Sequence, residues 1–296
     1  MSTIAKIYEP KGRAREYSPY ALNHYIGCDH GCVYCYGPAS MRLTREEYAV
    51  PRMRTLPKTL KADKQVLLSF ACDPYCRRDA QTWHTRAALK LLLESNTPVA
   101  VLTKGGNRLL RDLDLFRKFG DRPASCPPST EGGRRAASVP SHGTSPILGG
   151  RIMVGQTLTS FDSGWITKNE PEAAPYQERM EVFKTLKMNR IHTWASMEPV
   201  IDPYITVNII YDCLYAGLVD VFKIGKLNHE GKTAPLDYRG MLRDIVDTFR
   251  DAEHTGYYIK KDLQPYAEGL DIDPIHFDPD AWMVTSAPLG NRLEGI

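Results

Sequence analysis

Short apolar segments alternate with longer amphipathic segments over most of the chain, from about residue 22 to about residue 260. Strands that alternate with helices in this way predict βαβ units and a parallel sheet with right-handed crossovers. Six or seven such units favour a complete or partial (β/α) barrel over an open doubly wound sheet. The predicted strands are 22–27, 65–71, 98–103, 151–158, 191–197 and 219–224, with a seventh at 256–260.

The segments between these strands have the periodicity of helices. In 80–94, Trp83, Ala87 and Leu91 lie one turn apart on a predicted core-facing side, and Asp79 is a candidate N-cap. The other predicted helices are 107–118, 172–187 with Tyr176, Met180, Phe183 and Leu186 on its apolar side, 204–216 and 238–253.

One stretch interrupts this alternation. In residues 121–150, Gly, Pro and Ser occupy 15 of the 30 positions, so the segment lacks the apolar residues of a core. We interpret it as a flexible insertion, with a functional lid as the alternative, and Cys126 within it as an incidental thiol. The predicted organisation is an N-terminal extension (1–20), a partial barrel (21–235) and a C-terminal helix and strand extension (236–296).

The composition of the chain limits the classes of protein to which it can belong. The chain of 296 residues has a net charge of +3, but residues 1–64 carry an excess of Lys and Arg, which allows a nucleic-acid partner. The apolar runs are no longer than stretches such as "QVLLSF", which predicts neither a membrane span nor a signal peptide. We therefore expect a cytoplasmic protein. In a reducing compartment, seven cysteines favour metal or redox chemistry over disulfides.

Three of the cysteines form the motif C-x3-C-x2-C. Cys28, Cys32 and Cys35 directly follow the first predicted strand, where (β/α) barrels build their active sites. A structural zinc site normally has four protein ligands, whereas a cluster on three cysteines leaves one iron open for a ligand. A fourth ligand from His24, His30 or Cys72, and a zinc-binding module without enzymatic activity, remain alternatives at this point.

The motif "CDHGCVYCY", with Tyr36 after its last cysteine, resembles the signature of the radical S-adenosylmethionine (radical SAM) superfamily. The segments "SFACDPY" (69–75) and "LTKGGNRLLRDLDLF" (102–116) resemble its spore photoproduct lyase-like branch, which includes uncharacterised and phage-associated relatives. "TWASMEPVIDP" (193–203) and "VDVFKIGKLNH" (219–229) are similar to such relatives.

The resemblance implies a partial (β/α)6-type TIM barrel that carries a 4Fe-4S cluster on the three motif cysteines. The open iron of this cluster would chelate S-adenosylmethionine (SAM), and one electron would cleave SAM to a 5′-deoxyadenosyl radical that abstracts hydrogen from a substrate. An electron donor such as flavodoxin or ferredoxin is the implied partner. The implied activity is lyase-like, with its reaction type left open.

Polar residues at the predicted strand ends are the remaining candidates for the site. In the superfamily, such groups bind the amine, carboxylate and ribose of SAM, although Asp73 also suits a turn before Pro74 and Lys104 a surface charge. The candidate cofactor-binding residues are Tyr36, Asp73, Lys104, Thr157, Thr159, Glu198, Lys226 and Asn228.

Cys72 and Tyr75 are the candidate catalytic residues. Spore photoproduct lyases use a cysteine after the second strand as hydrogen donor, and Cys72 lies near that place, where the family spacing would instead select Phe70. A buried thiol without a chemical role is the alternative for Cys72. A nucleic acid is one predicted substrate, and a protein, peptide or nucleotide is the other.

Overall fold

The computed structural model describes residues 3–120, 150–227, 236–250, 252 and 255–285. Nearly all of the predicted insertion, with Cys126, and the candidate residue Asn228 lie outside this range.

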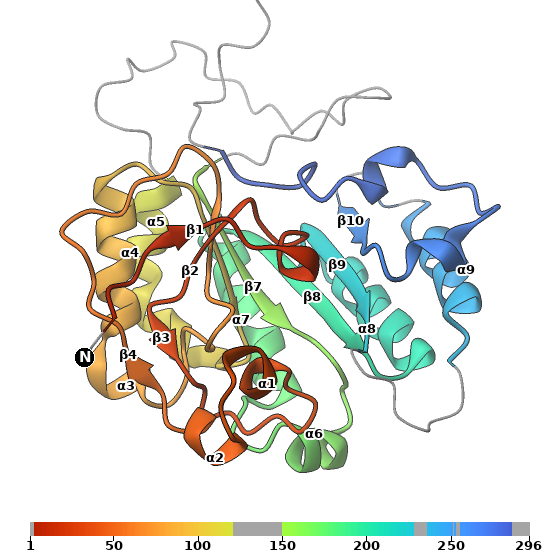
Figure 1. Cartoon of the computed structure of the whole chain (residues 1–296). Coiled ribbons are helices and arrows are strands. Elements are labelled where there is room, and N and C mark those ends of the chain that lie inside the picture. Colours follow the sequence, from red (N-terminus) through yellow and green to blue (C-terminus); the bar gives the residue numbers. More distant parts are fainter. Residues whose placement is uncertain (1–2, 121–149, 228–235, 251, 253–254, 286–296) are drawn as a thin grey trace, which may run out of the picture.

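A sheet of eight strands runs through the described part of the chain in the order β1-β2-β5-β6-β7-β8-β9-β10 (Figure 1). All neighbouring pairs from β2 to β10 are parallel, and only β1 is antiparallel to its neighbour. The sheet is open, since β1 and β10 are its two edges, and its mostly parallel order confirms the predicted α/β fold class of a partial barrel. The strands are β1 (Ile7–Tyr8), β2 (Tyr20–Leu22), β5 (Val66–Leu68), β6 (Val99–Thr103), β7 (Ile152–Thr157), β8 (His192–Val200), β9 (Val221–Lys226) and β10 (Gly256–Ile259).

The first predicted strand, 22–27, is wrong in its bounds. Strand β2 ends at Leu22, and residues Tyr25–Ile26 form β3, which pairs with β4 (Arg52–Met53) in a separate small sheet. Asn23 causes the break because its side-chain Oδ1 accepts hydrogen bonds from the backbone N–H groups of Phe70 (2.9 Å) and Ala71 (3.0 Å). A side chain thus takes the place of the backbone ladder at this point.

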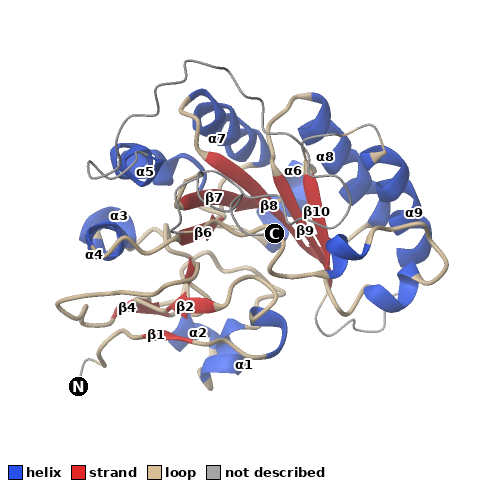
Figure 2. Cartoon of the chain, turned by 90° about the horizontal axis from the view of Figure 1, so that it is seen from above, coloured by secondary structure: helices blue, strands red, loops and turns tan. Residues whose placement is uncertain are grey.

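Helices cover one face of the sheet, and Figure 2 shows α4, α5, α7, α8 and α9 arranged around the outside of the strands. The strand β10 of the predicted C-terminal extension continues the sheet beyond β9, and the helix α9 that precedes it contacts α8. The helices are α1 (Gly37–Met41), α2 (Arg45–Tyr48), α3 (Asp79–Thr82), α4 (His84–Glu94), α5 (Leu113–Gly120), α6 (Ser163–Asn169), α7 (Tyr176–Met188), α8 (Pro203–Tyr215) and α9 (Tyr238–Phe249), with 3-10 helices at Gly12–Ala14, Gly106–Asp112, Gln264–Ala267 and Pro274–Phe277.

The core-facing side predicted for helix 80–94 is wrong at Trp83, whereas Leu91 is partly buried against the main core. Trp83 adopts a left-handed conformation (φ +55°), so the helix divides into α3 and α4, and the Trp83 side chain is half exposed. Helix α4 instead buries Thr85, Ala88, Leu89 and Leu92. Asp79 does not occupy an N-cap position, but its Oδ1 accepts from the N–H of Thr85 (2.9 Å) in the first turn of α4.

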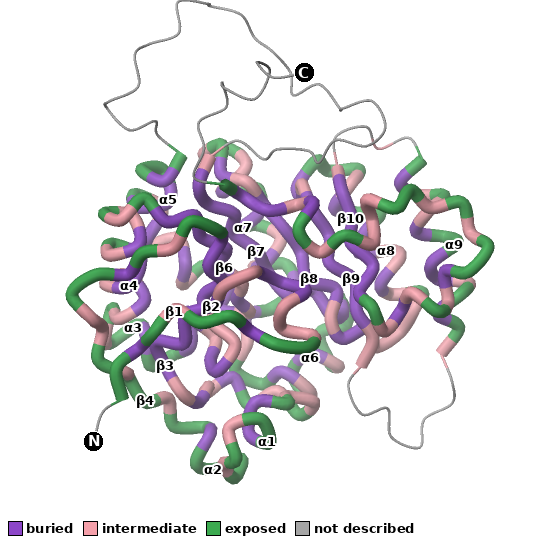
Figure 3. Tube along the Cα trace, turned by 45° about the horizontal axis from the view of Figure 1, so that its top comes forward, coloured by how far each residue is buried: buried purple, intermediate pink, exposed green. Residues whose placement is uncertain are grey.

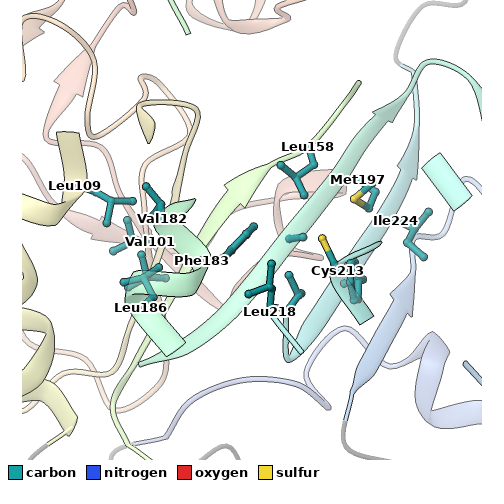
Figure 4. Close-up of a cluster of buried hydrophobic side chains, with 14 of the residues drawn as sticks. Val101, Leu109, Leu158, Val182, Phe183, Leu186, Met197, Cys213, Leu218 and Ile224 are labelled. Atoms are coloured by element: carbon teal, nitrogen blue, oxygen red, sulfur yellow. The ribbon is translucent and has the colours of Figure 1, made fainter. Parts of the chain in front are cut away.

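The main hydrophobic core lies between the sheet and its helices (Figure 3). Alternate strand residues such as Val101, Met197 and Ile224 belong to this core, together with Phe183 and Leu186 of α7 (Figure 4). Cys213 of α8 is fully buried in this core, so it is a packing thiol.

A second apolar cluster lies on the opposite face of the sheet. The residues that alternate with the core positions form it, together with two side chains from outside the strands, and its members are Leu67, Ala100, Met153, Trp194, Val221, Tyr17 and Val284. Tyr17 belongs to the N-terminal segment, which crosses in front of the sheet in Figure 1. This cluster fills the interior at one end of the strands and leaves their carboxyl ends for the site.

No helix in the described part of the chain is both long and apolar enough to cross a membrane.

Gly155 of β7 offers a test of the interior packing. A Cβ at this position would lie 2.5 Å from the Trp194 carbonyl oxygen and 2.6 Å from Trp194 Nε1, which donates to the Val101 carbonyl (3.0 Å). We expect Gly155→Ala to lower the free energy of unfolding by about 1–3 kcal/mol, as overpacking does. Urea unfolding measures it, and Gly120→Ala is the control because a Cβ there meets nothing within 4 Å. Equal stabilities of the two variants would contradict this packing.

Candidate active site

A cavity of about 730 Å³ lies at the carboxyl ends of the strands, on the face that the main helices leave open. The N-terminal segment contributes one wall, and the loop with the three motif cysteines contributes another. Leu67, Phe70 and Leu102 supply apolar lining beside these polar walls. The polar and sulfur-bearing lining residues include Tyr8, Arg13, Tyr17, Cys28, His30, Cys32, Tyr34, Cys35, Tyr36, Ser69, Cys72, Asp73, Thr103, Lys104, Thr157, Ser196, Glu198 and Lys260.

Backbone hydrogen bonds hold the cysteine loop at both ends. Gly27 has φ +91°, and a Cβ there would lie 2.6 Å from the Tyr48 carbonyl oxygen, so this position requires glycine. The same carbonyl accepts from the N–H of Cys28 at 2.7 Å. Farther along, the N–H of Val33 donates to the carbonyl of Asn169 (2.9 Å), which ties the loop to α6.

The Asp29 side chain joins this loop to the segment that follows β5. Its two carboxylate oxygens accept from the backbone N–H groups of Arg77 and Arg78, each at 2.9 Å. The loop is therefore positioned by contacts that do not use its cysteine thiols.

The three motif cysteines and Cys72 all face the same cavity. A hydrogen bond with Cys72 lowers the pKa of the Cys28 thiol to about 6, whereas burial raises the pKa of Cys32 to about 12. Burial also raises the pKa of Cys72 well above its usual value, and its Sγ lies 3.0 Å from the Asp73 carbonyl oxygen.

The Asp73 carboxylate accepts hydrogen bonds from neighbouring residues of the protein. It accepts from Thr103 Oγ1 (2.5 Å), from the N–H of Lys104 (2.7 Å) and from the N–H of Tyr75 (2.8 Å). His30 Nδ1 lies 3.4 Å from the same carboxylate. Asp73 thus fixes the loop after β6 and orients His30, and a turn-forming role accounts for these contacts.

Glu170 is the centre of a buried charged network beside the cysteine loop. It accepts from Arg179 (2.5 Å), Thr159 Oγ1 (2.7 Å) and Tyr34, and Lys104 Nζ lies 3.2 Å away. Burial alone would raise the pKa of Glu170, but the charges of Lys104 and Arg179 lower it far below its usual range. The ionised carboxylate therefore holds Tyr34 and Lys104 at the edge of the cavity.

Glu198, at the end of β8, is held by a second set of donors. Arg13 donates to its Oε1 at 2.8 Å, and Lys260 donates to its Oε2 at 2.6 Å. Tyr17 also donates to Oε2 and shares a 2.9 Å hydrogen bond with Ser196. These donors come from the N-terminal segment and from the residue after β10, far from Glu198 in the sequence.

Comparisons with known proteins bear on this arrangement. No protein-family model matches the chain. An uncharacterised protein of Methanocaldococcus jannaschii is 27% identical over 199 residues, which cover 64% of each chain. Spore photoproduct lyase complexed with dinucleoside spore photoproduct superposes with a TM-score of 0.55 at 10% identity, over 86% of this chain and 79% of that chain. The chain has the fold of the radical SAM enzymes.

A second structure with this fold is similar to a smaller extent. SuiB of Streptococcus suis superposes with a TM-score of 0.50 at 10% identity, over 86% of this chain and 52% of SuiB. The chain thus spans about half the length of SuiB and less than two thirds of the M. jannaschii protein. At the level of fold, these comparisons confirm the predicted resemblance to radical SAM enzymes and to spore photoproduct lyase.

The residues present fit the cluster that the radical SAM fold implies. Cys28, Cys32 and Cys35 provide three thiols in one cavity, and His30 Nε2 beside them is a buried polar atom without a hydrogen-bond partner among the described residues. In that same part of the chain, no three His, Cys, Asp or Glu side chains converge as the ligands of one metal ion do. Three thiolates that each bind a different iron of a cluster stand farther apart than such ligands.

Of the predicted site residues that the structure describes, three do not line the cavity. Tyr75 is buried in the main core with its hydroxyl bonded to Asp112 (2.9 Å), and Thr159 bonds to Glu170. Lys226 Nζ lies 5.4 Å and 5.6 Å from the ring centres of Tyr238 and Tyr266. Asn228 is outside the described residues. The cavity does collect Tyr36, Cys72, Asp73, Lys104, Thr157 and Glu198 with the motif cysteines.

Sequence reasoning missed several residues of the cavity. Tyr34 had a signal, because it is the aromatic residue within the motif itself, and its ring stacks on Trp165 with centroids 6.1 Å apart. Arg13, Tyr17 and Lys260 had none, because they lie far from every motif and reach the site only through the tertiary fold.

Glu170 supplies a test of the buried network. Glu170→Gln removes the charge that compensates Arg179 and Lys104, so we expect a loss of about 3–5 kcal/mol in the free energy of unfolding near pH 7. Because the pKa of Glu170 is depressed in the folded state, its contribution is present above the unfolded pKa and is lost as the pH falls through the folded value. Denaturant unfolding at several pH values measures both effects.

Glu181→Gln is the matched control for this substitution. Glu181 is exposed and pairs only with the exposed Lys184 among the described residues (2.5 Å). A loss for Glu170→Gln no larger than that of the control would contradict the network.

Proposed function

We propose that this chain is a radical SAM enzyme that holds a 4Fe-4S cluster on Cys28, Cys32 and Cys35. The observation that supports this most directly is that the C-x3-C-x2-C motif and the polar strand ends Lys104, Thr157 and Glu198 line one cavity of a parallel partial barrel. A zinc-binding module would need neither the cavity nor the charged groups that line it.

The bound cluster and SAM would supply one-electron cleavage of SAM and a 5′-deoxyadenosyl radical that abstracts hydrogen from the substrate. The residues of this chain would bind and orient SAM and the substrate, and they would exclude water from the site. Lys104 has three N–H donors, and among the described residues Tyr34 and Glu170 take two of them, so one remains for the carboxylate of SAM. Glu198 is the proposed acceptor for a hydroxyl or amine group of SAM. Thr157, whose hydroxyl can donate or accept, is a second proposed partner for these groups.

Cys72 is the proposed donor of a hydrogen atom to the substrate radical, which would leave a thiyl radical on Cys72. Its place in the cavity, next to Cys28, supports this role, whereas the burial of Tyr75 in the core does not support a catalytic role for that residue. An electron donor such as flavodoxin or ferredoxin is the proposed redox partner.

A nucleic acid is the substrate that we propose first. Tyr8 and Tyr36 are partly exposed lining residues, and aromatic rings beside basic groups suit bases and phosphates. Spore photoproduct lyase, which shares the fold, has been solved with a dinucleoside. In residues 3–64, the exposed basic side chains are Lys6, Lys11, Arg42, Arg45, Arg52, Lys58, Lys61 and Lys64, against exposed Glu9, Glu46, Glu47 and Asp63.

A protein, peptide or free nucleotide is the second candidate. The net charge of +3 is modest for a nucleic-acid enzyme, and this observation favours the alternative.

Substitution of the motif cysteines tests the cluster. We expect Cys28→Ala, Cys32→Ala and Cys35→Ala each to abolish the broad absorption near about 400 nm of anaerobically reconstituted protein, because each removes one iron ligand. Cys213→Ala is the matched control, since Cys213 lies in the main core away from the cavity. Wild-type absorption and iron content in any of the three motif variants would refute the proposed ligand set.

Product analysis tests the substrate class. Reduced, reconstituted enzyme is incubated with SAM alone and then with single-stranded DNA, duplex DNA, RNA or nucleotides, and 5′-deoxyadenosine is quantified. We expect a nucleic acid to raise its formation above the uncoupled background. If peptides raise it and no nucleic acid does, the second candidate replaces the first.

A further inference from the structure

Glu198 lies where three segments that are distant in the sequence meet. Arg13 and Tyr17 come from the N-terminal segment, and Lys260 follows β10, which is the edge strand of the sheet. Arg13 also donates to the carbonyl of Lys226 (2.7 Å), and Lys260 Nζ lies 3.4 Å from the carbonyl of Arg13. The edge strand and the N-terminal segment are thus fastened to the end of β8 through one carboxylate.

The hydrogen bonds from the described residues leave one acceptor position of this carboxylate unoccupied. An ionised carboxylate has about four acceptor positions, and Arg13 occupies one on Oε1 while Lys260 and Tyr17 occupy Oε2. Glu198 retains 12% exposure and lines the cavity. The remaining position on Oε1 can therefore accept a hydrogen bond from a molecule in the cavity.

The shortest contact of the Lys260 ammonium group is the one with Glu198. The Lys260 side chain is 1% exposed, lines the cavity, and has its Nζ 4.2 Å from the centre of the Tyr17 ring. A buried ion pair adds little to the stability of the folded state, because the desolvation of both charges offsets their attraction. The buried charge of Lys260 is better explained by a role in orienting Glu198 and keeping its carboxylate ionised.

We propose that Lys260, with Arg13 and Tyr17, is a positioning residue that keeps Glu198 as an ionised acceptor for a hydroxyl or ammonium group of the ligand. The ligand class is a polyhydroxylated or amino-bearing small molecule, and SAM is the probe because this inference rests on the proposed function. The N-terminal segment is then a part of the binding site, since it supplies two of the three donors to Glu198.

In the described part of the chain, four other ionisable groups surround Glu198 besides Lys260. Arg13 and Tyr17 approach from the N-terminal segment, Tyr36 from the cysteine loop, and Asp262 from beyond β10, where it pairs with Arg13 at 2.5 Å. Burial favours the neutral form of Glu198, and Lys260 makes the largest opposing contribution, so the pKa of Glu198 is lowered.

The test measures SAM affinity of the reconstituted protein by equilibrium dialysis between about pH 5.5 and about pH 8. Lys260→Met leaves burial to dominate, so the pKa of Glu198 rises and its carboxyl becomes protonated as the pH falls. We expect SAM binding to be about tenfold weaker or more than that of the wild type, with the ratio of the two affinities growing toward low pH; taking the ratio at each pH removes the titration of the SAM amine itself. Lys260→Arg should restore most of the affinity, because it keeps a charged donor.

Three further variants separate this effect from a structural one. Lys261→Met is the matched control, since Lys261 is the exposed neighbour of Lys260 and should bind SAM as the wild type does. Glu198→Gln should bind weakly at every pH, and adding Lys260→Met to it should cost little more. Asp262→Asn in the Lys260→Met background should leave the pH dependence in place, which assigns the titration to Glu198.

The outcomes are distinguishable. If wild-type protein with a full complement of iron binds no SAM, the proposed function fails. If the wild type binds SAM and Lys260→Met binds it as Lys261→Met does, or loses affinity equally at all pH values, the positioning role is overturned while the proposed function stands. A pH-dependent loss that Lys260→Arg reverses, with iron content unchanged, supports the positioning role.

Discussion

Parallel pairing of the strands from β2 to β10 is the constraint on which the rest of the structure depends. Parallel strands direct all their carboxyl ends to one edge of the sheet, so side chains that are distant in the sequence meet there. Thr103, Thr157 and Glu198 end three different strands and line one cavity with the three motif cysteines. The chemistry that we propose requires this convergence, since no single segment holds both the thiols and the polar groups.

Two carboxylates near this edge, Glu170 and Glu198, are largely removed from solvent, and each is compensated by partners that also fix its position. Glu170 is fully buried between Arg179, Thr159, Tyr34 and Lys104, and Glu198 is held by Arg13, Tyr17 and Lys260. The two networks lie on different walls of the cavity, one beside the cysteine loop and one beside the N-terminal segment. A polar ligand between them would meet a lysine on one side and a carboxylate on the other.

The sequence predicted the parts of the fold that depend on local pattern. Six of the seven predicted strands match β5 to β10 because each is an apolar run between turn signals, and the motif cysteines do share a cavity. The first strand was misjudged because the Asn23 side chain replaces backbone pairing, and the helix at 80–94 because Trp83 takes a left-handed conformation. The hydrophobic pattern of the sequence reveals neither the Asn23 hydrogen bonds nor the Trp83 conformation. Arg13, Tyr17 and Lys260 could not be predicted, because only tertiary contacts bring them to Glu198.

The central claim is that the cysteine loop carries a cluster whose open iron binds SAM in this cavity. Electron–nuclear double resonance of the reduced, reconstituted protein with SAM labelled with nitrogen-15 at its amine tests it most directly. The account predicts a hyperfine coupling between the label and the cluster that is absent when Cys32 is replaced by Ala. A cluster signal without any coupling to the label, or the absence of an iron–sulfur signal from fully reconstituted wild-type protein, would contradict it.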